Sequence, residues 1–223
     1  MTLTHRAVTS GIKGISRLLC RIDGDSLLQV PQQGPLILVC NHINFLEIPL
    51  VYSHLQPRPV TGYAKVETWD NPLLAPLFDL WEAIPIQRGA VDRDALQQGL
   101  EALEQGKILA ISPEGTRSGT GQLKRGHPGV ALMALMSGAP LLPLVYYGGE
   151  TFHHNVLRLQ RTDFRIRVGR PFHVRLCGVK PNRLVRQAIT DEIMYQLALL
   201  LPPEYRGAYA DLQRATTEFL EFG

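Results

Sequence analysis

Short apolar runs alternate along this chain with segments of helical pattern, and this alternation limits the possible folds more than any other feature. The runs occupy residues 36–40, 60–65, 83–87, 107–111 and 141–147. Continuous apolar runs of this length are typical of strands that are buried on both faces. Helices that join such strands cover the two faces of the sheet. We therefore expect an α/β fold, a single domain with a mainly parallel or mixed central sheet flanked by helices.

The segments around these runs predict the remaining elements. Helices are expected up to residue 22 and at 47–55, 92–105, 126–137 and 182–201, with Asn44 as the cap of the second helix. Residues 72–80 predict a broken helix or a membrane-facing loop, because Pro76 interrupts them. Further strands are expected at 26–30 and, as a pair near the sheet edge, at 164–168 and 172–176.

These elements divide the chain into three parts. An amphipathic helix (1–22) precedes the α/β domain (23–201), and a C-terminal tail (202–223) either closes over a cleft or rests on the core. The 223 residues are 45% apolar and 19% charged, which suits one soluble globular domain. A net charge of +3, without a basic run interleaved with aromatic residues, argues against nucleic-acid binding.

Cysteine usage and hydropathy suggest where the protein works. Cys20, Cys40 and Cys177 cannot all pair, and none has a metal-type spacing to another cysteine or a histidine. No apolar stretch reaches the roughly 18–20 residues that span a bilayer, and the N-terminus lacks a signal-peptide pattern. We therefore expect a reduced, cytoplasmic protein.

The first helix allows two interpretations. Apolar residues recur at helical spacing on one face, and basic residues lie four apart on another: Val8, Ile12, Ile15, Leu19 and Ile22 against Lys13, Arg17 and Arg21. Such a helix either packs on the domain with its charged side in water or lies in a bilayer interface. The pattern alone favours packing, whereas a lipid substrate would favour the interface.

The most informative motif follows the run at 36–40. Asn41 and His42 come directly after this strand, and Glu47 lies five residues beyond the histidine. In open α/β sheets, ligands bind at the carboxyl ends of the strands. A histidine oriented by a carboxylate can remove the proton of a hydroxyl near neutral pH. His42 and Glu47 are therefore the candidate catalytic pair.

Three further motifs follow other strands. In residues 112–118, Gly115 permits a tight turn of amides around an anion, and Arg117 suits phosphate oxygens unless it merely pairs with Glu114. Arg88 ends the strand at 83–87, and Pro143 lies in the last strand of the series. Each of these features also occurs in ordinary surface loops and edge strands.

Together, the four motifs resemble the glycerolipid acyltransferases, which include the 1-acylglycerol-3-phosphate acyltransferases. The resemblance covers residues 36–148 and implies a glycerolphosphate-acyltransferase-like fold. It implies catalysis by His42 and Glu47, an acceptor-phosphate role for Arg88 and an acyl-donor role for Pro143. It further implies a set of substrate-binding residues: Asn41, Glu114, Gly115, Thr116, Arg117 and Lys124.

The resemblance also implies the reaction and its setting. A fatty acyl group would move from acyl-CoA or acyl carrier protein to the hydroxyl of a lysophosphatidate-like lipid, at the inner face of the cell membrane. Neither a metal nor another cofactor is expected. We expect His153, His154 and His173 to be surface residues rather than metal ligands, and Cys40 to be a packing residue rather than a catalytic thiol.

One departure from the family pattern leaves alternatives open. Glu47 stands where the family carries an aspartate, and misplacing a catalytic group by about 1 Å can cost on the order of 100-fold in rate. The chain is therefore an active acyltransferase, an acyltransferase for another lipid alcohol, a lipid-binding pseudoenzyme or a thioester hydrolase. Glu47→Asp should preserve or improve a working pair, and it would activate a pseudoenzyme only by restoring the pair.

Overall fold

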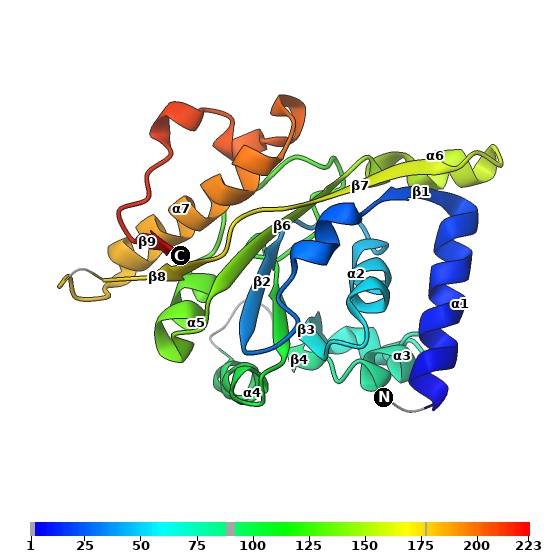
Figure 1. Ribbon diagram of the computed structural model, residues 1–223, viewed down its shortest axis with the longest axis horizontal. Coiled ribbons are helices and arrows are strands. Elements are labelled where there is room, and N and C mark those ends of the chain that lie inside the picture. The colour runs from blue at the N-terminus through cyan, green and yellow to red at the C-terminus, as the bar shows by residue number, and fades with distance from the viewer. Residues whose placement is uncertain (1–2, 88–91, 177) are drawn as a thin grey trace.

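The computed structural model describes residues 3–87, 92–176 and 178–223 as helices around one mixed sheet (Figure 1). The strands are β1 (Cys20–Asp23), β2 (Leu36–Cys40), β3 (Val60–Lys65), β4 (Ile84–Ile86), β5 (Ile108–Ile111), β6 (Leu141–Tyr147), β7 (Thr162–Val168), β8 (Phe172–Val174) and β9 (Leu220–Phe222). The α-helices are α1 (Leu3–Leu19), α2 (Glu47–Leu55), α3 (Ala75–Leu80), α4 (Arg93–Glu104), α5 (Gly129–Ser137), α6 (Phe152–Leu157) and α7 (Arg183–Leu200).

The sheet has the strand order β1-β7-β6-β2-β5-β3-β4. Strands β6, β2, β5, β3 and β4 are parallel to one another, so their carboxyl ends share one edge. Strand β7 is antiparallel to β6 and carries β1 as a parallel edge strand. This arrangement confirms the prediction of a single α/β domain with a mixed sheet.

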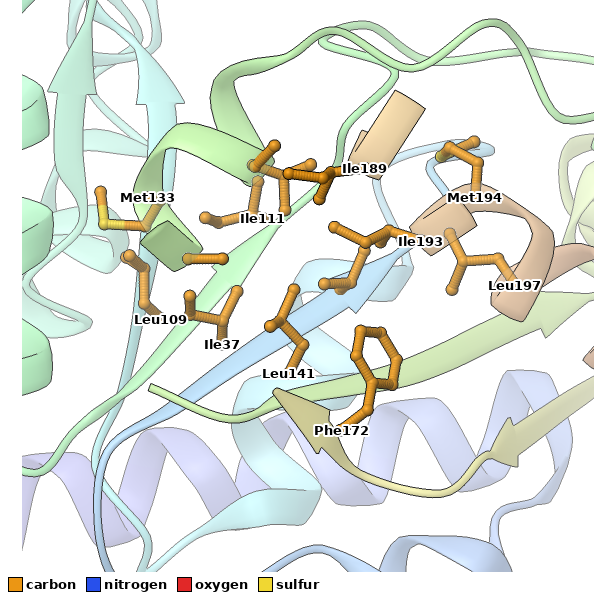
Figure 2. Close-up of a cluster of buried hydrophobic side chains, with 14 of the residues drawn as sticks. Ile37, Leu109, Ile111, Met133, Leu141, Phe172, Ile189, Ile193, Met194 and Leu197 are labelled. Carbon is orange, nitrogen blue, oxygen red and sulfur yellow. The ribbon is translucent and has the colours of Figure 1, made fainter. Parts of the chain in front are cut away.

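The sheet is buried on both faces because its central strands alternate their side chains between two hydrophobic clusters. Ile37 and Val39 of β2 pack with α4, α5 and α7, whereas Leu36 and Leu38 pack with α1, α2 and α6. Figure 2 shows the first cluster, where Ile189, Ile193 and Leu197 of α7 and Met133 of α5 meet strand residues, among them Leu109, Leu141 and Phe172. These clusters fix the edge at which the predicted motifs emerge.

Three sequence predictions about the fold are wrong. The first helix ends at Leu19, because the next four residues pair with β7 as the strand β1. Residues 26–30 are not a strand, and a 3₁₀ helix covers Asp25–Gln29 instead. Strands β7 and β8 do not pair with each other, since both join β6 and β8 also joins β9. In each case a distant strand, invisible to local pattern, decides the outcome.

The C-terminal segment rests on the core. Tyr209 and Leu220 are buried, and β9 extends the sheet through β8. Leu123, in the loop before α5, exchanges backbone hydrogen bonds with this segment: its N–H donates to the Tyr205 carbonyl, and its own carbonyl accepts from the Ala208 N–H, both at 2.9 Å. The segment therefore holds the loop that follows the Ser112–Ser118 motif.

The buried Arg58 lies at the amino ends of the central strands, opposite the edge that carries the predicted motifs. Sequence analysis did not identify this residue. Its guanidinium donates to the carbonyl oxygens of Pro31 at 3.1 Å and Gly106 at 2.8 Å, and also to that of Gly34. These carbonyls lie in the loops that lead into β2 and β5. Arg58 thus connects the amino ends of the central strands.

Replacing Arg58 should test this structural role. We expect Arg58→Met to lower the free energy of unfolding by about 3 kcal/mol, because three carbonyls lose the charged donor that the buried Arg58 supplies. Urea unfolding followed by circular dichroism measures the change, with the exposed Arg183→Met as the matched control. Equal stability of the two variants would contradict the role.

Candidate active site

The predicted catalytic pair is formed at the carboxyl end of β2. His42 Nδ1 lies 3.0 Å from Glu47 Oε2, and Glu47 is the first residue of α2. The other carboxylate oxygen of Glu47 accepts hydrogen bonds from the amides of Ile43, at 3.2 Å, and Asn44, at 2.8 Å. The carboxylate is buried and sits at a helix N-terminus, where the helix dipole favours a negative charge.

This arrangement assigns the roles of the two imidazole nitrogens. Because Nδ1 faces a carboxylate, it carries the proton and donates a hydrogen bond to Glu47. The Nε2 atom is then left unprotonated and able to accept a proton from a substrate. His42 is partly accessible while Glu47 is not, so the base faces the site and its carboxylate faces the protein.

The length of Glu47 is used in full. One oxygen reaches the imidazole, while the other reaches the backbone amides of Ile43 and Asn44. The prediction that Asn44 caps α2 is wrong, because the cap position is Leu46; Asn44 instead accepts from the Leu46 N–H at 2.8 Å and so fixes the turn before the helix. The methylene that separates Glu47 from the family's aspartate therefore spans the gap between the helix and the histidine.

Asn41 holds the catalytic turn against the neighbouring strand. Its side chain donates to the Tyr146 carbonyl and accepts from the Tyr146 N–H, both at 2.9 Å. These two bonds imitate a strand pairing to β6 at the point where β2 ends. The buried Asn41 is thus a positioning residue here, and a contact with substrate remains a prediction.

Glu114 connects the catalytic turn to the Ser112–Ser118 motif. Its buried carboxylate accepts from the His42 N–H and the Lys124 N–H, each at 2.9 Å, rather than from Arg117. Burial raises the pKa of this carboxyl above its usual value. The carbonyls of His42 and Ile43 in turn accept from Ser118 and Gly119. Glu114 therefore positions both motifs, and its predicted binding of the acceptor remains a prediction.

The rest of this motif forms an exposed basic loop beside His42. Thr116, Arg117 and Lys124 are exposed, and Lys124 Nζ donates to the Arg117 carbonyl at 2.8 Å. Gly115 adopts φ +65°, and a Cβ there would lie 3.2 Å from the ring of His127. The glycine is needed both for this backbone conformation and for the close approach of the histidine.

Two predicted residues do not join this cluster in the described structure. Arg88 lies outside the described residues, which end on that side at Gln87. Pro143 is buried in the middle of β6, opposite Val39, and packs near Gly169. It lines neither of the cavities described next, so its predicted link to the acyl donor remains a prediction without a contact to support it.

Two cavities meet at His42. The smaller, of about 80 Å³, passes Glu47 and ends among aromatic side chains that include Phe78 and Trp81. The larger, of about 440 Å³, runs between α4 and α5 along apolar residues such as Leu96, Leu132 and Met133. A cavity of this size is in the range that binds small ligands.

Sequence analysis missed several residues at this junction. Tyr63, Ala110 and Ser112 line both cavities together with His42, while Lys65 and Arg186 line the larger one alone. Ser112 directly follows β5, so the rule that locates ligands at the carboxyl ends of strands identifies it. Arg186 comes from α7, and no local signal in the sequence connects it to His42.

Among the described residues, the thiol beside the pair is unreactive and no metal cluster is found. Burial raises the pKa of the Cys40 thiol to about 12, so it stays neutral, and its Sγ lies 3.8 Å from the Ile111 carbonyl oxygen. Across residues 3–87, 92–176 and 178–223, His, Cys, Asp and Glu side chains form no group of three that could hold a metal ion. A reaction without metal or cofactor stays a prediction.

Comparison with known proteins identifies the class of enzyme. A profile of the acyltransferase family matches residues 22–147, slightly more than half of the chain. The chain therefore belongs to the acyltransferase family, as its motifs predicted, and its His42–Glu47 pair lies within the matched region. Its fold resembles that of the 1-acyl-sn-glycerophosphate (LPA) acyltransferase PlsC from Thermotoga maritima, with a TM-score of 0.64, 19% identity and coverage of 85% of this chain and 76% of that one.

The chain is also similar in sequence to two bacterial acyltransferases. A 1-acyl-sn-glycerol-3-phosphate acyltransferase from Bacillus subtilis is 23% identical over 165 residues, which cover 74% of this chain and 80% of that protein. A lyso-ornithine lipid O-acyltransferase from Pseudomonas aeruginosa is 32% identical over 125 residues, 56% of this chain. The matched region spans only 45% of the Pseudomonas protein.

The sequence alone suggested that Glu47→Asp would preserve or improve a working pair. The geometry of Glu47 leads us to expect the opposite. We expect Glu47→Asp to lower kcat about 100-fold, because the shorter carboxylate must withdraw from the imidazole or from the amides by about 1 Å. Steady-state kinetics should show little change in the acceptor KM.

A longer but neutral side chain provides the comparison. Glu47→Gln keeps the reach but always loses the charge, and its NH₂ group can also turn toward His42 Nδ1, so kcat should fall further, by up to about 10⁴-fold. Activity of Glu47→Asp equal to or above wild type would show that the reach of Glu47 does not limit catalysis.

Proposed function

We propose that this enzyme transfers a fatty acyl group from an acyl thioester, either acyl-CoA or acyl carrier protein, to the hydroxyl of a lysophosphatidate-like glycerolipid in phospholipid synthesis. The observation that carries the proposal is the oriented His42–Glu47 pair at the junction of two cavities, beside an exposed basic loop. The name of the Bacillus subtilis relative supports this acceptor.

The reaction needs one proton shuttle and no enzyme nucleophile. His42 Nε2 takes the proton of the acceptor hydroxyl as its oxygen forms a bond to the thioester carbonyl carbon. The carbon–sulfur bond of the tetrahedral intermediate then breaks, and the thiolate receives that proton from His42. Glu47 stabilises the imidazolium between these two steps.

The basic loop is suited to hold the acceptor phosphate. Arg117 offers a planar fork of donors, and Lys124 adds a second positive charge nearby. Glu114 accepts from the backbone amides of His42 and Lys124 and so keeps the backbone of this loop beside His42. Arg88, which the family resemblance assigns to the acceptor phosphate, is proposed as a further ligand of the phosphate.

The larger cavity is proposed to accept an acyl chain. Its walls between α4 and α5 are apolar, while its mouth carries His42, Lys65 and Arg186. A chain in this cavity would have its carboxyl end beside the catalytic base. Burial of the methylene groups would contribute about 0.8 kcal/mol for each.

Helix α1 is proposed to contact the inner face of the cell membrane. Ile12 and Leu19 pack against the domain, as a packed helix requires, whereas Leu3, Ile15 and Leu18 are exposed. The packed residues support the packing interpretation, and the exposed residues are available for the proposed contact with a bilayer interface. In the part of the chain that the structure describes, no helix combines the length and the apolar character needed to cross a bilayer.

A second acceptor deserves a direct test. The Pseudomonas aeruginosa relative is named for lyso-ornithine lipid, an acceptor other than lysophosphatidate. The intact geometry of the pair argues against a pseudoenzyme, and it suits attack by a lipid hydroxyl or by water. Acyl-thioester cleavage without any acceptor would identify a hydrolase.

Release of free thiol tests the proposal. Purified enzyme should release CoA from acyl-CoA only when lysophosphatidic acid is present, and His42→Ala should reduce release at least 10³-fold, roughly the loss expected of a general base.

Arg117→Ala should raise the acceptor KM at least tenfold while the donor KM changes little, with the exposed Arg183→Ala as control. Acylation of lyso-ornithine lipid but not of lysophosphatidic acid, with either donor, would overturn the phosphate acceptor.

The cavity assignment is tested by filling the cavity. Leu132→Trp should shift the donor preference to acyl chains shorter by several carbons, because the indole occupies the space between α4 and α5. Leu135→Trp is the matched control, since Leu135 is also half-buried on α5 but lines neither cavity. Competition between acyl-CoA chain lengths measures the shift. An unchanged preference in a folded Leu132→Trp enzyme would contradict the assignment.

A further inference from the structure

The turn between α6 and β7 exposes two leucines almost completely. Leu157 is 86% exposed and Leu159 is 96% exposed, although both are large apolar side chains. Arg158 lies between them, and Arg161 begins the approach to β7. Single exposed leucines are common, but two in one turn with an arginine between them form an apolar tip with a basic rim.

The turn is rigidly built in spite of this exposure. The Asn155 carbonyl accepts from the amides of Arg158, at 3.0 Å, and Gln160, at 2.8 Å. The Asn155 side chain donates to the hydroxyls of Thr151 and Thr162, both at 3.1 Å. The leucines are therefore held in place rather than left on a loose loop.

Leu159 adopts a backbone conformation that leucine disfavours. Its φ is +56°, in the left-handed region that suits glycine or asparagine. No buried contact explains leucine there, because the side chain is almost entirely in water. A strained, exposed apolar residue indicates a contact with another molecule.

The tip lies beside the end of α1. Arg161 donates from Nη2 to the carbonyl oxygens of Arg17 and Cys20, both at 2.6 Å. In Figure 1, α6 reaches past β1 toward the same edge of the molecule that α1 follows. The exposed Leu18 of α1 belongs to this edge, and Arg17 adds to its positive charge.

We propose that the α6–β7 turn inserts Leu157 and Leu159 into the headgroup region of an anionic lipid bilayer, as a second membrane contact beside α1. The inference rests on the proposed function, which places the substrate in a membrane. The leucines supply apolar area, and Arg158 complements the negative surface of the lipid. A second copy of this chain is the alternative occupant of the tip.

The turn is mechanically connected to the catalytic site. Helix α6 has six residues and spans about 9 Å. At its other end Phe152 packs edge-on against Phe45, with ring centroids 5.9 Å apart, and the Gly149 carbonyl accepts from Asn44 Nδ2 at 2.7 Å. Insertion of the tip would therefore bring the turn that carries His42 close to the lipid surface.

Vesicle binding tests the proposal. Leu157→Ser combined with Leu159→Ser should weaken partitioning into phosphatidylglycerol–phosphatidylcholine vesicles by about 30-fold to 100-fold, on the basis of the apolar area that each leucine contributes. Leu184→Ser is the matched control. Leu184 is 79% exposed at the start of α7, which lies far from the α6–β7 turn. Arg158→Gln should weaken binding about fivefold on anionic vesicles only.

A second variant separates membrane contact from a structural role. Leu159→Gly should raise Tm, because glycine suits φ +56°, and yet weaken vesicle binding. A purely structural role predicts that both quantities change in the same direction. The double serine variant should keep full transfer activity on detergent-dispersed lysophosphatidic acid, which separates this proposal from the proposed function.

Two outcomes would overturn the proposal. The first is unchanged vesicle partitioning of the double serine variant. The second is a concentration-dependent dimer of wild type, detected by analytical ultracentrifugation and abolished by the double serine change, which would assign the tip to a second copy of the chain. Loss of activity in detergent for wild type itself would instead contradict the proposed function.

Discussion

The catalytic site depends on how the Glu47 carboxylate is shared between two sides of one turn. One oxygen orients His42, and the other is held by the amides of Ile43 and Asn44. A buried carboxylate without such partners would be costly, and an imidazole without an oriented carboxylate would lack a fixed tautomer. The same interaction therefore stabilises the turn at the start of α2 and orients the imidazole that is proposed as the base.

Buried polar side chains form the frame around this pair. Asn41 attaches the turn to β6, and Glu114 attaches it to the basic loop through the amides of His42 and Lys124. The C-terminal segment holds the same loop through Leu123. Residues that the family resemblance assigns to substrate binding thus fall into two groups: Asn41 and Glu114 are buried and position the turn, while Gly115, Thr116, Arg117 and Lys124 are exposed.

Local pattern predicted the central sheet well and its edges poorly. The apolar runs of β2, β3, β5 and β6 are buried on both faces, so their composition alone identifies them. Strand β1 was assigned to the first helix, because Ile22 continues its apolar spacing. Only β7, more than a hundred residues away, makes this segment a strand. The β8–β9 pairing is likewise set by contacts that no sequence window contains.

The sequence by itself determined the family, through the acyltransferase motifs, and the arrangement of strands whose carboxyl ends share one edge; it also identified the histidine and the carboxylate that the structure brings together. These features are local in the chain or repeat with a fixed period, so they can be read without coordinates. Only the tertiary structure decided that Glu114 supports His42 rather than pairing with Arg117, that two cavities meet at the base, and that the leucines of the α6–β7 turn lie beside α1. Each of these depends on residues far apart in sequence that packing of the sheet and helices brings into contact.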